Sequence, residues 1–251
     1  MSHLVKIPFR TFYVVVASFP LLAFFSCVIL SILRNFDEVT ATHCQVQNYL
    51  PSISTAVGDT FPQKYIWRIG IALHCTPRFL VTLMYYKHFQ NSFPINSRWQ
   101  TSASAILIFQ NLEITSLVGL SYISSVEDFP VHQKLFVTFV ISALVSMSLL
   151  YAVYAYASNN RLYGLLSNCH DNHTSPRLEM KSTRYKFILL NVNFAAFCLS
   201  VYFYVRHNWY CEPGMYTLFA LAEYFVVLSN IGYHLTAVWD FPNQYIIVGA
   251  G

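Results

Sequence analysis

The chain has 251 residues, of which 10% are charged and 55% are hydrophobic, and its mean hydropathy is +0.44. An ordinary globular chain carries about 25% charged residues, so this composition argues against a soluble domain and against a disordered chain. The formal net charge of +4 is too small to indicate a polyanion such as nucleic acid as a partner.

The apolar segments predict an all-α polytopic membrane protein, a bundle of six transmembrane helices in a single domain. A bilayer-spanning helix needs about 20 mostly apolar residues. Stretches of this kind cover about residues 11–33, 65–86, 103–124, 135–156, 187–205 and 216–239. The first is longer than the apolar region of a signal peptide and lacks a cleavage motif, so it is interpreted as a retained helix with a kink at Pro20.

The distribution of Lys and Arg predicts that both termini are cytosolic. Nine of these residues, Lys186 included, lie at the N-terminus and in the loops after the second and fourth spans, whereas four lie in the other loops. Because Lys and Arg concentrate in cytosolic loops, the nine mark the cytosolic side. The sequon at Asn172 is then cytosolic and stays unglycosylated, and glycosylation there would overturn the orientation.

Two of the six cysteines, Cys44 and Cys211, fall in loops on the predicted non-cytosolic side. An oxidising compartment would allow them to form a disulfide. The alternative is a pair of unpaired loop cysteines. A gel shift under non-reducing conditions that is lost in Cys44→Ser would support the disulfide.

Several polar side chains lie inside the predicted spans. A charged side chain at mid-bilayer costs about 2.5–3.5 kcal/mol, and such residues usually face the bundle interior and mark function. Arg78 and Glu113 fall at similar depth, so they are candidates for a buried pair. Interhelical hydrogen bonding is the alternative role of each residue, but three spans with inward polar stripes favour a lined cavity. The stripes contain His74 and Arg78, then Gln110, Glu113 and Ser116, then Glu223, Asn230 and His234.

Four segments carry a resemblance to a known family. They are ATHCQVQNYLPSIS after the first span, Arg78-Phe79-Leu80, YISSVEDF, and VRHNWYCEPGMYTLFALAEYFVVLSNIGYHLTAVWDF. Over about Arg10 to Phe241 the chain resembles the post-GPI attachment to proteins factor 2 family. The resemblance implies a multi-pass protein of the Golgi membrane, with the endoplasmic reticulum as a second location, that acts in fatty-acid remodelling of GPI anchors.

The activity that the resemblance implies is reacylation of lyso-GPI at sn-2 with a saturated chain, or support of that step. Motifs do not settle whether the family catalyses the transfer, so the alternative is a non-enzymatic scaffold or lipid-presenting partner of a separate acyltransferase. No cofactor or metal is expected to be bound, and stearoyl-CoA is the candidate acyl donor. Candidate partners are lyso-GPI-anchored proteins, membrane lipids and another remodelling enzyme.

This chemistry gives candidate roles to the polar residues. Acyl transfer needs a base for the sn-2 hydroxyl, and the inositol phosphate needs cations. The candidates for the base are His43, His74 and His207, and Glu113 or Asp128 would orient it. The substrate-binding candidates are Arg68, Arg78, Arg206, Glu223, Asn230, His234 and Asp240.

Overall fold

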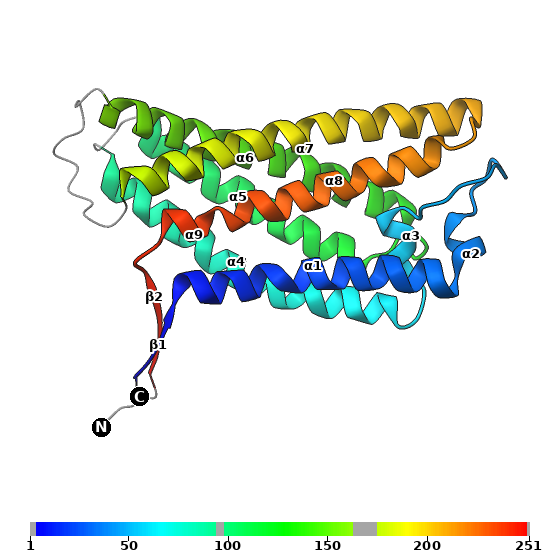
Figure 1. Ribbon diagram of the computed structural model, residues 1–251, viewed down its shortest axis with the longest axis horizontal. Helices are drawn as coiled ribbons and strands as arrows, with labels where there is room; N and C mark the ends of the chain where they lie inside the picture. Colours follow the sequence, from blue (N-terminus) through cyan, green and yellow to red (C-terminus); the bar gives the residue numbers. More distant parts are fainter. Residues whose placement is uncertain (1–3, 94–97, 163–174, 250–251) are drawn as a thin grey trace.

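The computed structural model describes residues 4–93, 98–162 and 175–249, and its long helices run side by side as one bundle (Figure 1). The long helices are α1 (Phe9–Arg34), α4 (Gln63–Ser92), α5 (Arg98–Tyr122), α6 (Phe129–Leu162), α7 (Pro176–Tyr210) and α8 (Met215–Leu235). The short elements are β1 (Leu4–Pro8), α2 (Phe36–Thr40), α3 (Ile53–Gly58), α9 (Ala237–Asp240) and β2 (Tyr245–Gly249).

Each predicted span overlaps one long helix, and the predicted all-α membrane fold is confirmed. Five helical segments of the described chain are long and apolar enough to cross a bilayer, namely α1, α5, most of α6, α7, and α8 together with α9. Helix α4 has 30 residues, but its polar side chains keep it outside that set. The protein is therefore a multi-pass membrane protein, and a sixth crossing by α4 stays a prediction.

Helices α6 and α7 are longer than the spans predicted for them. They contain 34 and 35 residues, or roughly 50 Å each at 1.5 Å per residue, against a hydrocarbon core of about 30 Å. The hydrophobic run marks only the part of a helix that lies in lipid, so hydropathy underestimates its length. Pro176 occupies the first turn of α7, where a missing backbone N–H costs nothing.

Close backbone approach helps to pack α1 against α4. A Cβ atom placed on Gly70 would lie 2.7 Å from the Cβ of Ala23, so only glycine permits this spacing. Helices in lipid have little hydrophobic drive to associate, and small residues and polar contacts take over that role. The α1–α4 contact is therefore an example of small-residue packing.

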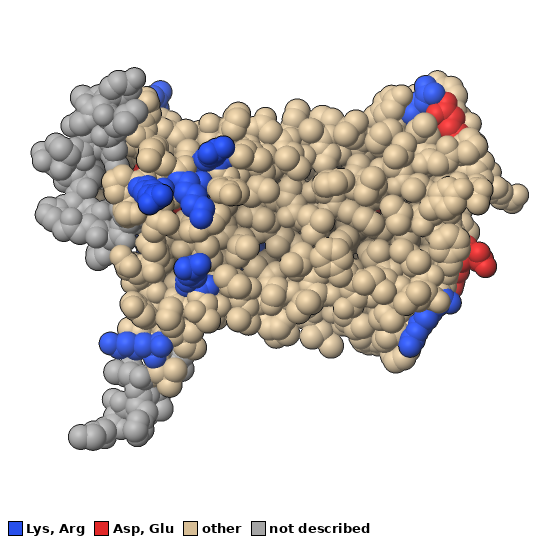
Figure 2. Space-filling model, viewed as in Figure 1, with Lys and Arg blue, Asp and Glu red and all other residues tan. Residues whose placement is uncertain are grey.

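On the face shown in Figure 2, the exposed charged side chains lie toward the two ends of the bundle. Lys and Arg gather at the end that carries the paired strands β1 and β2, whereas Asp and Glu appear with Lys and Arg at the opposite end. This separation fits the predicted orientation, which stays a prediction, and Asn172 lies outside the described residues. The prediction that Lys186 lies in a cytosolic loop is wrong. Lys186 belongs to α7 and its side chain is fully buried.

The first and last parts of the chain are joined at both ends of the bundle. At one end β1 pairs with β2 in antiparallel register, Leu4 opposite Gly249. At the other end a disulfide links Cys44, after α2, to Cys211, at the C-terminus of α7. The segment between α2 and α4 thereby lies over the end of the bundle that we call the α3 end.

Candidate functional site

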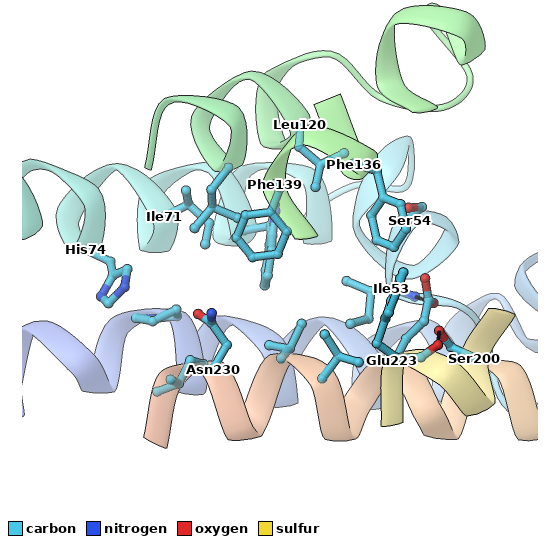
Figure 3. A pocket seen from close by; sticks show the side chains of 17 residues that line it. Ile53, Ser54, Ile71, His74, Leu120, Phe136, Phe139, Ser200, Glu223 and Asn230 are labelled. Atoms are coloured by element: carbon cyan, nitrogen blue, oxygen red, sulfur yellow. Dashed lines mark hydrogen bonds between the residues drawn. The ribbon is translucent and has the colours of Figure 1, made fainter. Parts of the chain in front are cut away.

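A largely apolar cavity lies between the helices toward the α3 end (Figure 3). Its volume is about 80 Å³, below the range of about 300–1,000 Å³ that is typical of small-molecule sites. Phe139 projects into its middle. Figure 3 shows polar side chains at both ends, with Ser54, Ser200 and Glu223 at one end and His74 and Asn230 at the other.

A second cavity adjoins the first and has a volume of about 440 Å³, within the range that is typical of small-molecule sites. The two share the lining residues Ser54, Phe136, Phe197, Ser200 and Glu223. Val137 of α6 and Val201 of α7 line the second cavity and are 48% and 47% exposed. The cavity therefore reaches the outer surface between α6 and α7, where a bilayer would meet it sideways.

Ser54 and His132 form a hydrogen-bonded pair in the wall of the second cavity. The Oγ of Ser54 lies 3.0 Å from Nε2 of His132, and Nδ1 of His132 lies 2.7 Å from the carbonyl oxygen of Ile123. A carbonyl oxygen can only accept, so in the neutral ring Nδ1 carries the proton and Nε2 accepts from the serine hydroxyl. A hydroxyl beside a base that a third group orients is the arrangement of an activated nucleophile.

Glu223 holds the segment that carries Ser54 against α8. Its carboxylate accepts a hydrogen bond from the backbone N–H of Ile53 at 3.2 Å. The hydroxyl of Tyr224 donates to the carbonyl oxygen of Pro51 at 2.6 Å. These two contacts fix Ser54 at the cavity, although the segment belongs to a connection between helices.

Glu113 is the centre of a buried polar network that adjoins the inner end of the first cavity. Its side chain is fully buried, and Arg78, 3% exposed, donates to it at 2.9 Å. Ser146 and Asn230 donate to it at 3.0 Å and 3.2 Å. His234 Nε2 lies 2.8 Å from both the carboxylate and Arg78, so it can donate to one or accept from the other. In this network interhelical hydrogen bonding accounts for the polar side chains.

His74 compensates for a proline in the neighbouring helix. Pro20 lies inside α1 and has no N–H to donate to the carbonyl of Val16, four residues earlier. Nδ1 of His74 lies 3.1 Å from that carbonyl oxygen and supplies the missing donor. The proton is thus on Nδ1 in the neutral ring, and His74 lines the first cavity.

A second buried ion pair lies at the end opposite α3. Lys186 and Asp240 are 2.6 Å apart, and both side chains are fully buried. Tyr85 and Ser182 also donate to Asp240, at 2.5 Å and 2.6 Å. Asp240 therefore belongs to a packed cluster, separate from the Glu113 network.

The remaining candidates lie outside the walls of both cavities. His43 and His207 face each other beside the disulfide, with ring centroids 5.6 Å apart. Within the described residues, His43, Cys44 and Cys211 form the only group of potential metal ligands, and the disulfide occupies both of its sulfur atoms. Asp128 accepts from the N–H of Val131 at 3.0 Å and so caps α6.

The arginine candidates also have other partners. Arg206 pairs with Glu212, and Arg68 donates to the carbonyl of Tyr122 at 2.8 Å. Glu113 hydrogen-bonds His234 and, within the described residues, none of the three histidines predicted as the base.

Ser54 and His132 were not among the predicted site residues, because they are 78 positions apart and no motif connects them.

Comparisons with known proteins agree with one another. A family model described as the Frag1/DRAM/Sfk1/Cwh43P N-terminal domain matches residues 8–244. The chain is similar to the acyltransferase PGAP2 of Xenopus tropicalis, with 39% identity over 98% of this chain and 93% of the relative. It is also similar to post-GPI attachment to proteins factor 2 of Drosophila melanogaster, with 39% identity over 99% and 92% of the two chains, and of Caenorhabditis elegans, with 38% over 98% and 90%. No solved structure matches.

Proposed function

Because the chain belongs to the post-GPI attachment to proteins factor 2 family, we propose that it transfers a saturated acyl chain to the sn-2 hydroxyl of lyso-GPI. Family membership and the apolar helices make it a membrane protein of GPI-anchor remodelling. The Xenopus relative is named an acyltransferase, which supports an enzyme over a scaffold.

The observation that carries the proposal is the apolar cavity that opens sideways between α6 and α7 and contains a serine–histidine pair. An acyl chain fits the apolar part of the cavity, and its ester end lies at the polar rim. A histidine there removes the proton of the attacking hydroxyl. The neighbouring hydroxyls of Thr55 and Tyr216 line the same cavity and supply donors for the oxyanion.

The proposed location is the Golgi membrane, with the endoplasmic reticulum as a second site. The cavity lies toward the α3 end, which the charge distribution predicts to be non-cytosolic. Lyso-GPI lies in that leaflet, with its sn-2 hydroxyl near the interface. Substrate and proposed active site then meet at the same depth of the membrane.

The first test uses the purified protein with lyso-GPI and a labelled stearoyl donor, either stearoyl-CoA or a phospholipid. Transfer by this protein alone is the expected result. Transfer that requires a second protein would contradict the enzyme and favour the scaffold or lipid-presenting role.

A second test fills the cavity in cells that lack the endogenous protein. Ser200 is 4% exposed and lines both cavities, so Ser200→Phe occupies the space of the acyl chain. It should abolish the return of saturated chains to GPI anchors, measured by mass spectrometry. Leu199→Phe is the matched control, because Leu199 is 50% exposed on another face of α7. Equal activity of the two variants would contradict the cavity as the site.

A further inference from the structure

We propose that Ser54 carries the acyl group covalently, with His132 as its base, and that the donor is a diacyl phospholipid of the bilayer. The inference rests on the proposed function and adds an acyl-serine intermediate and a donor class to it. It makes the reaction a two-step transacylation.

The geometry separates His132 from two other buried histidines, His74 and His234, and the buried His207 lies outside the walls of both cavities. Nδ1 of His74 donates to the carbonyl oxygen of Val16, and His234 lies between Arg78 and Glu113. Neither of them contacts a hydroxyl within the described chain. His132 is 8% exposed, so the hydrogen bond between Nε2 and Ser54 is shielded from solvent yet open to the cavity.

The position of Ser54 also favours a reacting group over a purely structural one. Its side chain is partly exposed and lines both cavities. A carbonyl carbon at the polar rim of the cavity would therefore meet the hydroxyl, while its chain extends toward Phe136 or Phe139. The hydroxyl is already hydrogen-bonded to the base that must take its proton.

The surroundings of the cavity identify the donor. Toward the opposite end of the bundle, two buried clusters block passage, Arg78 with Glu113 and Lys186 with Asp240. A polyanionic acyl-CoA from that end would have to break both. The opening at Val137 and Val201 instead faces the lipid, where esters of phospholipids are already present. A bilayer ester reaches Ser54 without crossing the protein.

The chemistry balances without a further reactant. In the first step the Oγ of Ser54 bonds to the acyl carbon, and the C–O bond to the phospholipid glycerol breaks. The Ser54 proton passes through Nε2 of His132 to the leaving glycerol oxygen, which yields a lysophospholipid. In the second step the sn-2 hydroxyl of lyso-GPI gives its proton to His132 and bonds to the acyl carbon. Ser54 then leaves and recovers the proton.

The test uses the full chain in vesicles of phosphatidylcholine labelled in the sn-2 stearoyl chain. Without an acceptor, label should accumulate on the peptide that contains Ser54, as read by mass spectrometry. Addition of 2-lyso-phosphatidylinositol should discharge it. Ser54→Ala and His132→Ala should each lower transfer by at least about 100-fold. Ser54→Cys should carry the label as a thioester that hydroxylamine removes.

Ser142→Ala is the control, because Ser142 is a buried serine of α6 outside both cavities and bonds only to its own helix. It should transfer at the wild-type rate. Retention of the Cys44–Cys211 disulfide in each variant reports folding separately from activity.

Failure of the inference and failure of the proposed function give different results. Two results overturn the inference and leave the proposed function intact. One is transfer by Ser54→Ala at the wild-type rate, and the other is transfer by the wild type from stearoyl-CoA but not from phosphatidylcholine. Absence of transfer from either donor by the wild type overturns the proposed function. An acyl-serine that forms but is not discharged by the acceptor overturns the two-step scheme.

Discussion

Replacement of Glu113 by leucine should destabilise the bundle strongly, because it leaves Arg78 buried without its carboxylate. The pair is 2.9 Å apart, with 3% and 0% of the side chains exposed. Removal of one partner of a buried ion pair costs about 3–5 kcal/mol. Most of this cost is the uncompensated charge of the arginine.

The double variant Arg78→Met with Glu113→Leu separates charge from packing. It removes the uncompensated charge and loses mainly the hydrogen bonds that Ser146, Asn230 and His234 make to Glu113. Hydrogen bonds between membrane helices average about 0.6 kcal/mol each, so the double variant should lose about 2 kcal/mol. It should therefore be about 1–3 kcal/mol more stable than Glu113→Leu, or roughly 5- to 140-fold in the unfolding constant.

The assay is unfolding of the purified protein in mixed micelles by titration with sodium dodecyl sulfate. Glu38→Leu is the control and should change the free energy of unfolding by at most about 0.5 kcal/mol, because Glu38 is exposed and its side chain bonds to that of half-buried Asn35. A double variant no more stable than Glu113→Leu would refute the reasoning, as would a single variant as stable as the wild type.

Three other predictions concern the loops at the α3 end. Gln45→Asn with Gln47→Thr creates a glycosylation site, and Asn tolerates the positive φ of 54° at position 45. This site should gain a glycan that an endoglycosidase removes, whereas Asn172 should carry none. The opposite pattern would invert the predicted orientation. Cys44→Ser and Cys211→Ser should each abolish the same mobility shift on a non-reducing gel, and an unchanged shift would exclude the disulfide. The N–H of Ser124 and the ammonium of Lys64 bind the Glu127 carboxylate at 3.0 Å and 2.9 Å and lower its pKa to about 2. Because the folded-state pKa is depressed, this contribution to stability is present above the ordinary value of 4.5 and is lost as the pH falls toward 2; a carboxyl NMR titration with a midpoint near 4.5 would contradict it.

The helices could be predicted from the sequence because an apolar run of bilayer length is a local property. The Arg78–Glu113 pair followed from the matching depth of two residues in their spans, and it is present in the structure. Depth along a helix is enough to bring two charges together when the helices are neighbours.

The missed contacts depend on tertiary structure. Lys186 was assigned to a loop because hydropathy counts it as a charge, whereas Asp240 neutralises it inside the bundle. Ser54 reaches His132 only because Glu223 and Tyr224 hold the preceding residues on α8. No periodicity in the chain indicates that a connecting segment folds back onto the bundle.

The two links between the early and late parts of the chain have a mechanical consequence. The β1–β2 pairing and the Cys44–Cys211 disulfide restrain α1 and α8 at opposite ends of the bundle. Separation of α1 from α8 would strain both links, so we expect helices to separate more readily at other boundaries of the bundle. The boundary between α6 and α7 has neither link at the α3 end, and there the cavity already meets the surface. The proposed entry of a lipid between α6 and α7 therefore lies at a helix boundary that neither link restrains.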